Sequence, residues 1–222
     1  MKYEIFGAPM PAVTVNLAKG ESVNTQAGGM CWMTDGLTMK TSTGGFKKGL
    51  SRMLTGESLF INTYTAEKDA SITFASSVPG DILALDLSGG KQYVAQKTAY
   101  LAGDTTVNVE MTTTRVSAGL VGGEGWILQK ITGSGTVFLE ISGSIKEVEL
   151  APGQVLKVDS GNIGAFESSV TYTAEVVKGL KNIAFGGEGL FLARLEGPGK
   201  VWLQTMSISE LAGSIAPYIA AK

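Results

Sequence analysis

The chain has 222 residues, of which 44% are hydrophobic and 17% charged, and a formal net charge of −2. Nucleic-acid binding normally requires a basic excess on one face, so this charge argues against a nucleic-acid partner. The apolar content suffices for a core, and no apolar run approaches the ~20 residues of a membrane-spanning helix.

Two residue types narrow the chemistry further. The chain has one cysteine, Cys31, and no histidine. This composition excludes an intramolecular disulfide, a cysteine-based zinc site and the Ser-His-Asp and Cys-His nucleophiles. The first residues show no signal-peptide pattern. We therefore expect a cytoplasmic protein with no catalytic residue, no metal and no cofactor.

A turn followed by a short apolar strand occurs at 19–30, 79–90 and 152–163. This alignment places Gly20, Gly80 and Gly153 at one position. The 30 glycines of the chain recur at turn-like intervals and indicate boundaries between strands. The pattern predicts a mostly β protein of short antiparallel strands.

A glycine-bounded hairpin is the second recurring segment. GGEGLFLARLEGPGKVWL at 186–203 matches 122–139 with an offset of 64, and a third copy begins at Gly44. Ungapped alignment places Ile61, Leu139 and Leu203 together. Alternation along 137–141 predicts one buried strand face. The repetition predicts one domain of three β units, 1–66, 67–143 and 144–207, around a pseudo-threefold centre.

The last residues follow a different pattern. Ser207 or Ser209 is a candidate N-cap for a helix in 208–222, and Pro217 should end or kink that helix. Apolar residues near one helical face predict that this short C-terminal helix docks on the β body.

Several motifs resemble the altered-inheritance-of-mitochondria family of the twenty-four type. They are Gly28-Gly29-Met30, RMLTGESLFINT at 52–63, Pro79-Gly80, GGEGLFLARLEGPGKVWLQ at 186–204, and the closing Ser-x-x-Glu-Leu-Ala at 207–212 with Ala-Pro-Tyr at 216–218. The resemblance is closest to the compact bacterial members. It implies antiparallel β-sandwich or barrel units of the TRAP-like (tryptophan RNA-binding attenuator protein-like) fold. It also implies a link, in fungi, to mitochondrial inner-membrane organisation, and no enzymatic activity.

Three basic residues fall at one position of the repeated hairpin: Arg52, Lys130 and Arg194. Around a pseudo-threefold centre they could bind an anion or phosphate. The alternative is three solvated strand residues, which is the usual environment of long basic side chains.

One loop mixes apolar and cationic residues, namely Phe46, Lys47, Lys48, Leu50 and Met53. This composition suits contact with an anionic membrane surface or a membrane partner. It equally suits a loop that folds its apolar residues onto the sheet and leaves its lysines in water.

The segment 30–33, together with Met39, is rich in Met and Trp. Alternation predicts Met30 and Trp32 on one strand face, with Cys31 and Met33 on the other. We expect these side chains to fill the core; a ligand pocket or an oligomer contact is the alternative.

Glycine-rich and acidic motifs invite catalytic interpretations that the residues do not support. The stretch at 197–201, GPGKV, lacks the remaining P-loop residues, so we predict a hairpin turn. Glu124, Glu188 and Glu57 do not align across the three copies, and we predict solvated turn carboxylates.

The functional hypothesis is a non-enzymatic scaffold or interaction protein that forms a homo-oligomer. It includes association with a membrane, peripherally at its inner face. The alternative is a small-ligand or anion-binding protein that uses the centre between the repeats. An RNA role by analogy of fold alone has no support in the residues.

Overall fold

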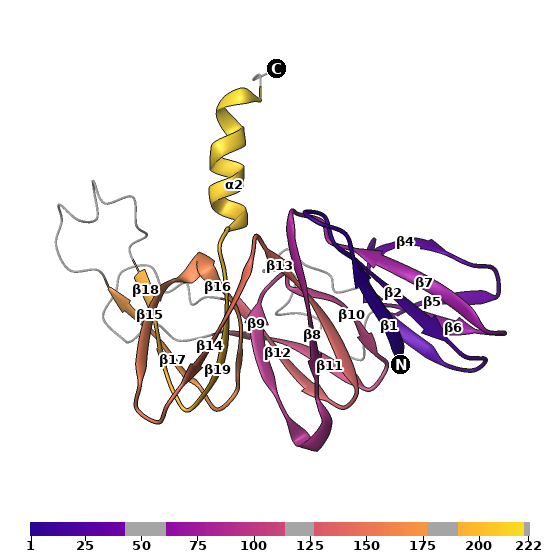
Figure 1. Ribbon diagram of the computed structural model, residues 1–222, viewed down its shortest axis with the longest axis horizontal. Helices are drawn as coiled ribbons and strands as arrows, with labels where there is room; N and C mark the ends of the chain where they lie inside the picture. The colour runs from indigo at the N-terminus through magenta and orange to yellow at the C-terminus, as the bar shows by residue number, and fades with distance from the viewer. Residues whose placement is uncertain (43–60, 114–126, 177–190, 220–222) are drawn as a thin grey trace. The chain divides into compact units, whose positions relative to one another are not determined.

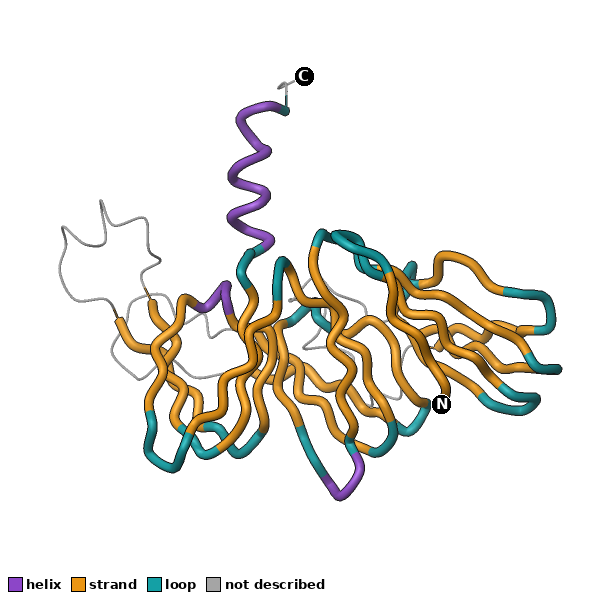
Figure 2. The backbone as a smooth tube through the Cα atoms, in the orientation of Figure 1, coloured by secondary structure: helices purple, strands orange, loops and turns teal. Residues whose placement is uncertain are grey.

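The computed structural model describes residues 1–42, 61–113, 127–176 and 191–219. Most of these residues belong to antiparallel β-strands (Figures 1 and 2). The mostly β fold class is therefore confirmed. Contacts divide the chain into two compact units: unit 1 is Met1–Gly90, Tyr100–Asn108 and Gly133–Glu140, and unit 2 is Lys91–Ala99, Val109–Thr132 and Ile141–Lys222.

Unit 1 contains a four-stranded and a six-stranded sheet that share one core. Valines and aromatics from both sheets, such as Val15, Phe74, Val23 and Phe138, belong to the same buried cluster. In sheet order the first sheet is β1 (Lys2–Phe6), β2 (Ala12–Leu17), β7 (Ala70–Ala75) and β4 (Met30–Met33). The second is β5 (Leu37–Ser42), β6 (Ile61–Ala66), β3 (Ser22–Gln26), β10 (Tyr100–Asp104), β13 (Thr136–Ser142) and β8 (Gly80–Asp86).

Hydrophobic alternation explains the unit 1 strands that line this core. In β2 the buried Val13, Val15 and Leu17 alternate with more exposed residues, as a strand with one core face requires. In β13 the alternation fails, because Phe138 and Glu140 are buried as well as Val137 and Leu139. The prediction of a single buried face is therefore wrong for β13, which lies between β10 and β8.

Unit 2 contains a six-stranded and a three-stranded sheet around a second core. Leu128 and Phe166 of the larger sheet share a buried cluster with Val158 and Leu195 of the smaller one. The six-stranded sheet is β11 (Val107–Thr113), β12 (Ile127–Gly133), β9 (Tyr93–Gln96), β16 (Ile163–Glu167), β19 (Gly199–Gln204) and β14 (Ile145–Leu150). The three-stranded sheet is β15 (Val155–Asp159), β18 (Phe191–Glu196) and β17 (Thr171–Val176).

The same strand-pairing scheme occurs three times along the chain. Neighbours in a sheet are β2 and β7, β8 and β13, and β14 and β19. A second set of equivalent neighbours is β3 and β6, β9 and β12, and β15 and β18. A third set is β4 and β7, β10 and β13, and β16 and β19. In the last three pairs the register shifts at Met30/Trp32, Tyr100/Ala102 and Ile163/Ala165. The pseudo-threefold centre, the unit boundaries and the TRAP-like grouping stay predictions.

Two of the predicted alignments differ from this pairing. The residue just before each register shift pairs with Phe74, Leu139 or Leu203. Phe74, and not Ile61, is therefore the residue of the first copy that corresponds to Leu139 and Leu203. The ungapped alignment offsets the first copy by 78 residues, whereas the pairing makes Phe74 equivalent to Leu139, an offset of 139 − 74 = 65. Gly90, rather than Gly80, corresponds to Gly20 and Gly153, as its backbone conformation shows.

Gly20, Gly90 and Gly153 each lie a few residues before a strand in the same role: β3, β9 and β15. Their φ angles are +88°, +78° and +75°, and no heavy atom lies within 4 Å of a Cβ built on any of them. Residues with a side chain rarely adopt this left-handed region, so backbone conformation explains the choice of glycine.

The C-terminal helix α2 (Ile208–Ile215) is followed by the 3-10 turn η4 (Ala216–Tyr218). Ser207 and Glu210 form a reciprocal capping box at its start, which confirms the predicted N-cap. Proline in η4 coincides with the end of the α-helix, as predicted. The predicted docking on the β body is wrong, because α2 has no buried residue. No helix in the described part of the chain is long and apolar enough to cross a membrane.

Candidate interaction surface

Strand β4 is an edge of the four-stranded sheet of unit 1. Its sequence Met-Cys-Trp-Met is apolar, yet Trp32 is 56% exposed and Met33 42% exposed. The expectation that this segment fills the core is therefore wrong for Trp32 and Met33, whereas Met30 packs against the unit 1 core. The predicted face alternation is also interrupted, because the register shift between Met30 and Trp32 inserts one unpaired residue, Cys31.

Strands β10 and β16 correspond to β4 in the repeated pairing scheme, but each lies inside its sheet. Each has the same register shift as β4 and pairs with a second neighbour, β3 for β10 and β9 for β16. The first four residues of both strands are buried. In the described residues, β4 pairs with β7 alone. Strand β4 is therefore exposed because, among the described strands, it has no second neighbour.

The opposite edge of the same sheet is also apolar. All five residues of β1 are exposed, including Tyr3, Ile5 and Phe6. The Phe6 and Trp32 rings lie 6.4 Å apart between centroids. We call the following set the unit 1 apolar surface: Tyr3, Ile5, Phe6, Met10, Trp32 and Met33, each 38–56% exposed.

The sequence indicates Trp32 and Met33 as candidate contact residues, but it gives no such indication for the N-terminal part of this surface. The sequence of β1, Lys-Tyr-Glu-Ile-Phe, alternates polar and apolar residues and would have predicted a strand with one apolar face. Nothing in that pattern says whether the apolar face meets a core or water. An isolated exposed apolar residue is ordinary, whereas exposed aromatic rings that lie close together, as Phe6 and Trp32 do, are typical of a contact site.

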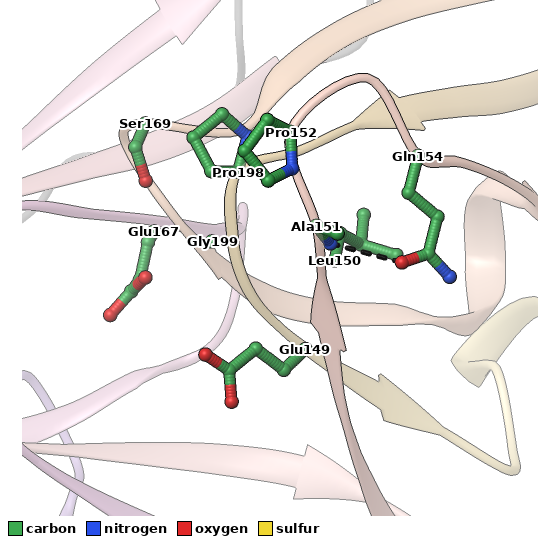
Figure 3. Close-up of a pocket in the computed structure, with 9 residues that line it drawn as sticks. All are labelled: Glu149, Leu150, Ala151, Pro152, Gln154, Glu167, Ser169, Pro198 and Gly199. Atoms are coloured by element: carbon green, nitrogen blue, oxygen red, sulfur yellow. Dashed lines mark hydrogen bonds between the residues drawn. The ribbon is translucent and has the colours of Figure 1, made fainter.

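A pocket of about 610 Å³ lies among the turns of unit 2 (Figure 3). Its acidic residues are Glu149 and Glu167, and Pro198 and Gly199 belong to its wall. The GPGK stretch lies at the turn between β18 and β19, so the prediction of a turn is confirmed. The prediction of a hairpin is wrong, because β18 and β19 belong to different sheets. A Cβ at Gly199 would lie 2.6 Å from Ser169 Oγ, so the close approach of the two turns requires glycine.

The carboxylate of Glu167 already has a structural partner in this pocket. Its Oε2 accepts a hydrogen bond of 2.9 Å from the backbone N–H of Lys200. The corresponding atoms of unit 1 make the same contact, since Asp104 Oδ2 accepts one of 2.7 Å from Thr136 N. Thr34 Oγ1 accepts one of 2.9 Å from Ser71 N. These acceptors hold the starts of β19, β13 and β7.

The side chain of Lys200, beside this pocket, also has a partner. Lys200 Nζ lies 2.6 Å from Glu147 Oε1, and this bond holds the pKa of Glu147 below its usual range. The same ion pair raises the pKa of Lys200. Within the described residues, no group of three His, Cys, Asp or Glu side chains could hold a metal ion.

The predicted anion-binding residues are only partly described. Lys130 is exposed on β12, in the six-stranded sheet of unit 2. Arg194 lies on β18, in the three-stranded sheet, and forms an ion pair of 2.5 Å with Glu196. Neither lines the pocket of Figure 3. Arg52 lies outside the described residues, so the anion site stays a prediction.

The predicted membrane-contact residues lie outside the described part of the chain. This applies to Phe46, Lys47, Lys48, Leu50 and Met53. It also applies to the paired glycines that begin the three predicted hairpins and to Glu57, Glu124 and Glu188.

Comparison with known proteins agrees with the resemblance seen in the sequence. An uncharacterized protein of Streptococcus pyogenes serotype M6 is 30% identical over 218 residues, covering 94% of this chain and 87% of that protein. An X-ray crystal structure of a Streptococcus pyogenes protein matches with a TM-score of 0.78 and 28% identity, covering 98% of this chain and 99% of the other. The family described as mitochondrial biogenesis AIM24 matches residues 3–206. The chain therefore belongs to the AIM24 family and resembles its uncharacterized bacterial members.

Proposed function

We propose that this protein is a non-enzymatic interaction protein that self-associates through the unit 1 apolar surface. The observation that supports the proposal is the exposure of Trp32, Met33, Ile5 and Phe6 on the two edges of one sheet. Burial of apolar surface contributes about 25 cal/mol per Å². An edge strand adds unpaired backbone groups that another strand can satisfy.

Sedimentation velocity over a range of protein concentrations tests the proposal. The wild-type protein should show concentration-dependent species larger than a monomer, and Trp32→Glu should shift the distribution toward monomer. Tyr218→Gln is the matched control, because Tyr218 is 88% exposed on η4, away from β1 and β4 in the sequence. A wild-type protein that stays monomeric at every concentration would contradict the proposal.

Peripheral contact with a membrane is a second candidate, with the protein in the cytoplasm at the inner face of that membrane. Exposed apolar residues on and after α2 favour it: Ile208, Ile215 and Ile219 are 41%, 47% and 68% exposed. An amphipathic helix can lie in the interface with its apolar side in the lipid. Ile208 and Ile215 are about two helical turns apart on α2, so their side chains lie on the same helical face and can enter the same lipid region.

Vesicle co-sedimentation tests this candidate with anionic and neutral liposomes. Ile215→Ser/Ile219→Ser should reduce the bound fraction if α2 makes the contact. Lys47→Glu/Lys48→Glu should reduce it, on anionic vesicles only, if the predicted loop makes the contact. Wild-type protein that stays in the supernatant with both vesicle types would contradict membrane contact.

A further inference from the structure

Two strands at sheet edges, one from each unit, have complementary pairing roles. In the described residues, β4 pairs only with β7, and β15 pairs only with β18. We propose that β4 of one protein molecule pairs with β15 of a second copy of the same chain. The inference rests on the proposed self-association and names the two surfaces that perform it.

The role of β4 is defined by its two counterparts. Strands β10 and β16 share its register shift against β13 and β19, and each has a second antiparallel neighbour. Those second neighbours are β3 and β9. The strand that β4 lacks is therefore one that plays the part of β3 and β9.

Strand β15 plays that part. It pairs with β18 as β3 pairs with β6 and β9 pairs with β12, and it follows Gly153 as the other two follow Gly20 and Gly90. Both β3 and β9 have a second neighbour, whereas β15 is the edge of its sheet. Val155 is 38% exposed and Lys157 is exposed, so this edge is open to a partner.

The register of the proposed pair follows from the two observed ones. Ala102 lies opposite Thr25, and Ala165 lies opposite Ala95. Ala102 and Ala165 are the first residues after the register shift, a position that Trp32 occupies in β4. Thr25 and Ala95 come five residues after Gly20 and Gly90, and five residues after Gly153 is Val158.

This counting places Trp32 opposite Val158 and Met33 opposite Lys157 in an antiparallel pair. The apolar Trp32 then covers the edge of the smaller unit 2 sheet, and the stem of Lys157 packs against Met33. The two edges differ, so each molecule offers one β4 edge and one β15 edge. Such head-to-tail contact closes into a ring of two or more molecules or extends into an open chain.

Disulfide cross-linking between two differently tagged proteins tests the pairing and its register. One protein carries Cys31→Ser and Met33→Cys, and the other carries Cys31→Ser and Lys157→Cys. Opposed residues in an antiparallel pair have Cα atoms about 4.5–5.5 Å apart, which is within disulfide range. Each chain has one cysteine, so a bond that joins the two tags forms between molecules.

The matched control replaces Lys157→Cys with Val155→Cys, two residues away on the same strand. This shift moves the Cα atom by about 7 Å along β15, which places it beyond disulfide reach. Under mild oxidation the Met33/Lys157 mixture should give at least about ten times more reducible heterodimer than the control, as expected for paired against unpaired geometry.

Equal cross-linking in the two mixtures, or none in either, would overturn the proposed pairing. Sedimentation of the wild-type protein then distinguishes failure of the β4–β15 pairing alone from failure of self-association. If the wild type associates without the specific cross-link, the β4–β15 contact is wrong while self-association stands. If the wild type is monomeric, both proposals are wrong.

Discussion

The indole Nε1 of Trp202 donates a hydrogen bond of 2.9 Å to the carboxylate of Glu147, across the β14–β19 pair. The other oxygen of the same carboxylate lies 2.6 Å from Lys200 Nζ. One glutamate thus joins two residues of the neighbouring strand in the sheet of unit 2.

This arrangement predicts a stability that depends on pH. The hydrogen bond from Lys200, with a smaller one from Trp202, holds the pKa of Glu147 below its usual range despite partial desolvation. A lowered carboxyl pKa stabilises the fold above the unfolded-state pKa, and the contribution disappears as the pH falls through the folded-state pKa. Because Glu147 is half exposed, the contribution is no more than about 1 kcal/mol.

Urea unfolding of wild type and Glu147→Gln at pH 7 and pH 3 measures this effect. The difference in unfolding free energy between the two proteins should shrink at the lower pH. Glu4→Gln on β1 removes the same charge elsewhere. An equal wild-type–mutant difference at both pH values would show that the Glu147 carboxylate does not act through its ionised form.

Gly133 should be among the least replaceable glycines of the chain. Its φ is +109°, and a Cβ there would overlap the backbone carbonyl oxygen of Thr106. Gly133→Ala should lower the unfolding free energy by about 3 kcal/mol, from strain and overlap together. Gly20→Ala is the control: its φ is +88° with open space around it, so the cost should be about 1 kcal/mol. Equal losses in urea unfolding would contradict the structural difference.

The acceptors at the strand starts should contribute to stability. Asp104→Ala leaves the N–H of Thr136 without its 2.7 Å partner, and Glu167→Ala does the same to Lys200 N–H. Each change should cost about 1–2 kcal/mol in urea unfolding. Ser168→Ala, an exposed neighbour of Glu167, is the control. Losses no larger than that of the control would show that these hydrogen bonds are not structural.

A charge-swap series should reveal the proposed register in solution. Met33→Lys places a like charge opposite Lys157 and should weaken self-association about two- to five-fold, the usual range for a cross-strand pair. Adding Lys157→Glu should restore it. Met39→Lys adds the same charge on the exposed side of β5 and should have little effect. Equal weakening by Met33→Lys and Met39→Lys, without rescue, would contradict the register.

The sequence predicted the fold class well because its signals were local. Strands such as β2 alternate apolar and polar residues, turns contain glycine, and Ser207 with Glu210 makes a capping box within four residues. These features depend on neighbours in the chain. The match of Gly20 with Gly153 also held, since backbone conformation requires glycine at both positions.

The candidate surface was harder to predict because exposure depends on partners distant in the sequence. Met30–Met33 reads as a core strand, and its counterparts in β10 and β16 are indeed buried. Only the missing neighbour of β4 makes Trp32 a surface residue. Likewise, α2 has the apolar periodicity of a docked helix, yet none of its residues is buried.

Cys31 occupies the extra position at the register shift of β4 and is exposed, whereas Leu101 and Gly164 at the same position of β10 and β16 are buried. The natural chain therefore carries its single thiol on the edge that should change accessibility when molecules meet. The alkylation rate of this thiol, followed by mass spectrometry, reports the occupancy of the edge without any substitution. A rate that falls as protein concentration rises measures the association on the unmodified protein, and a constant rate places the contact elsewhere.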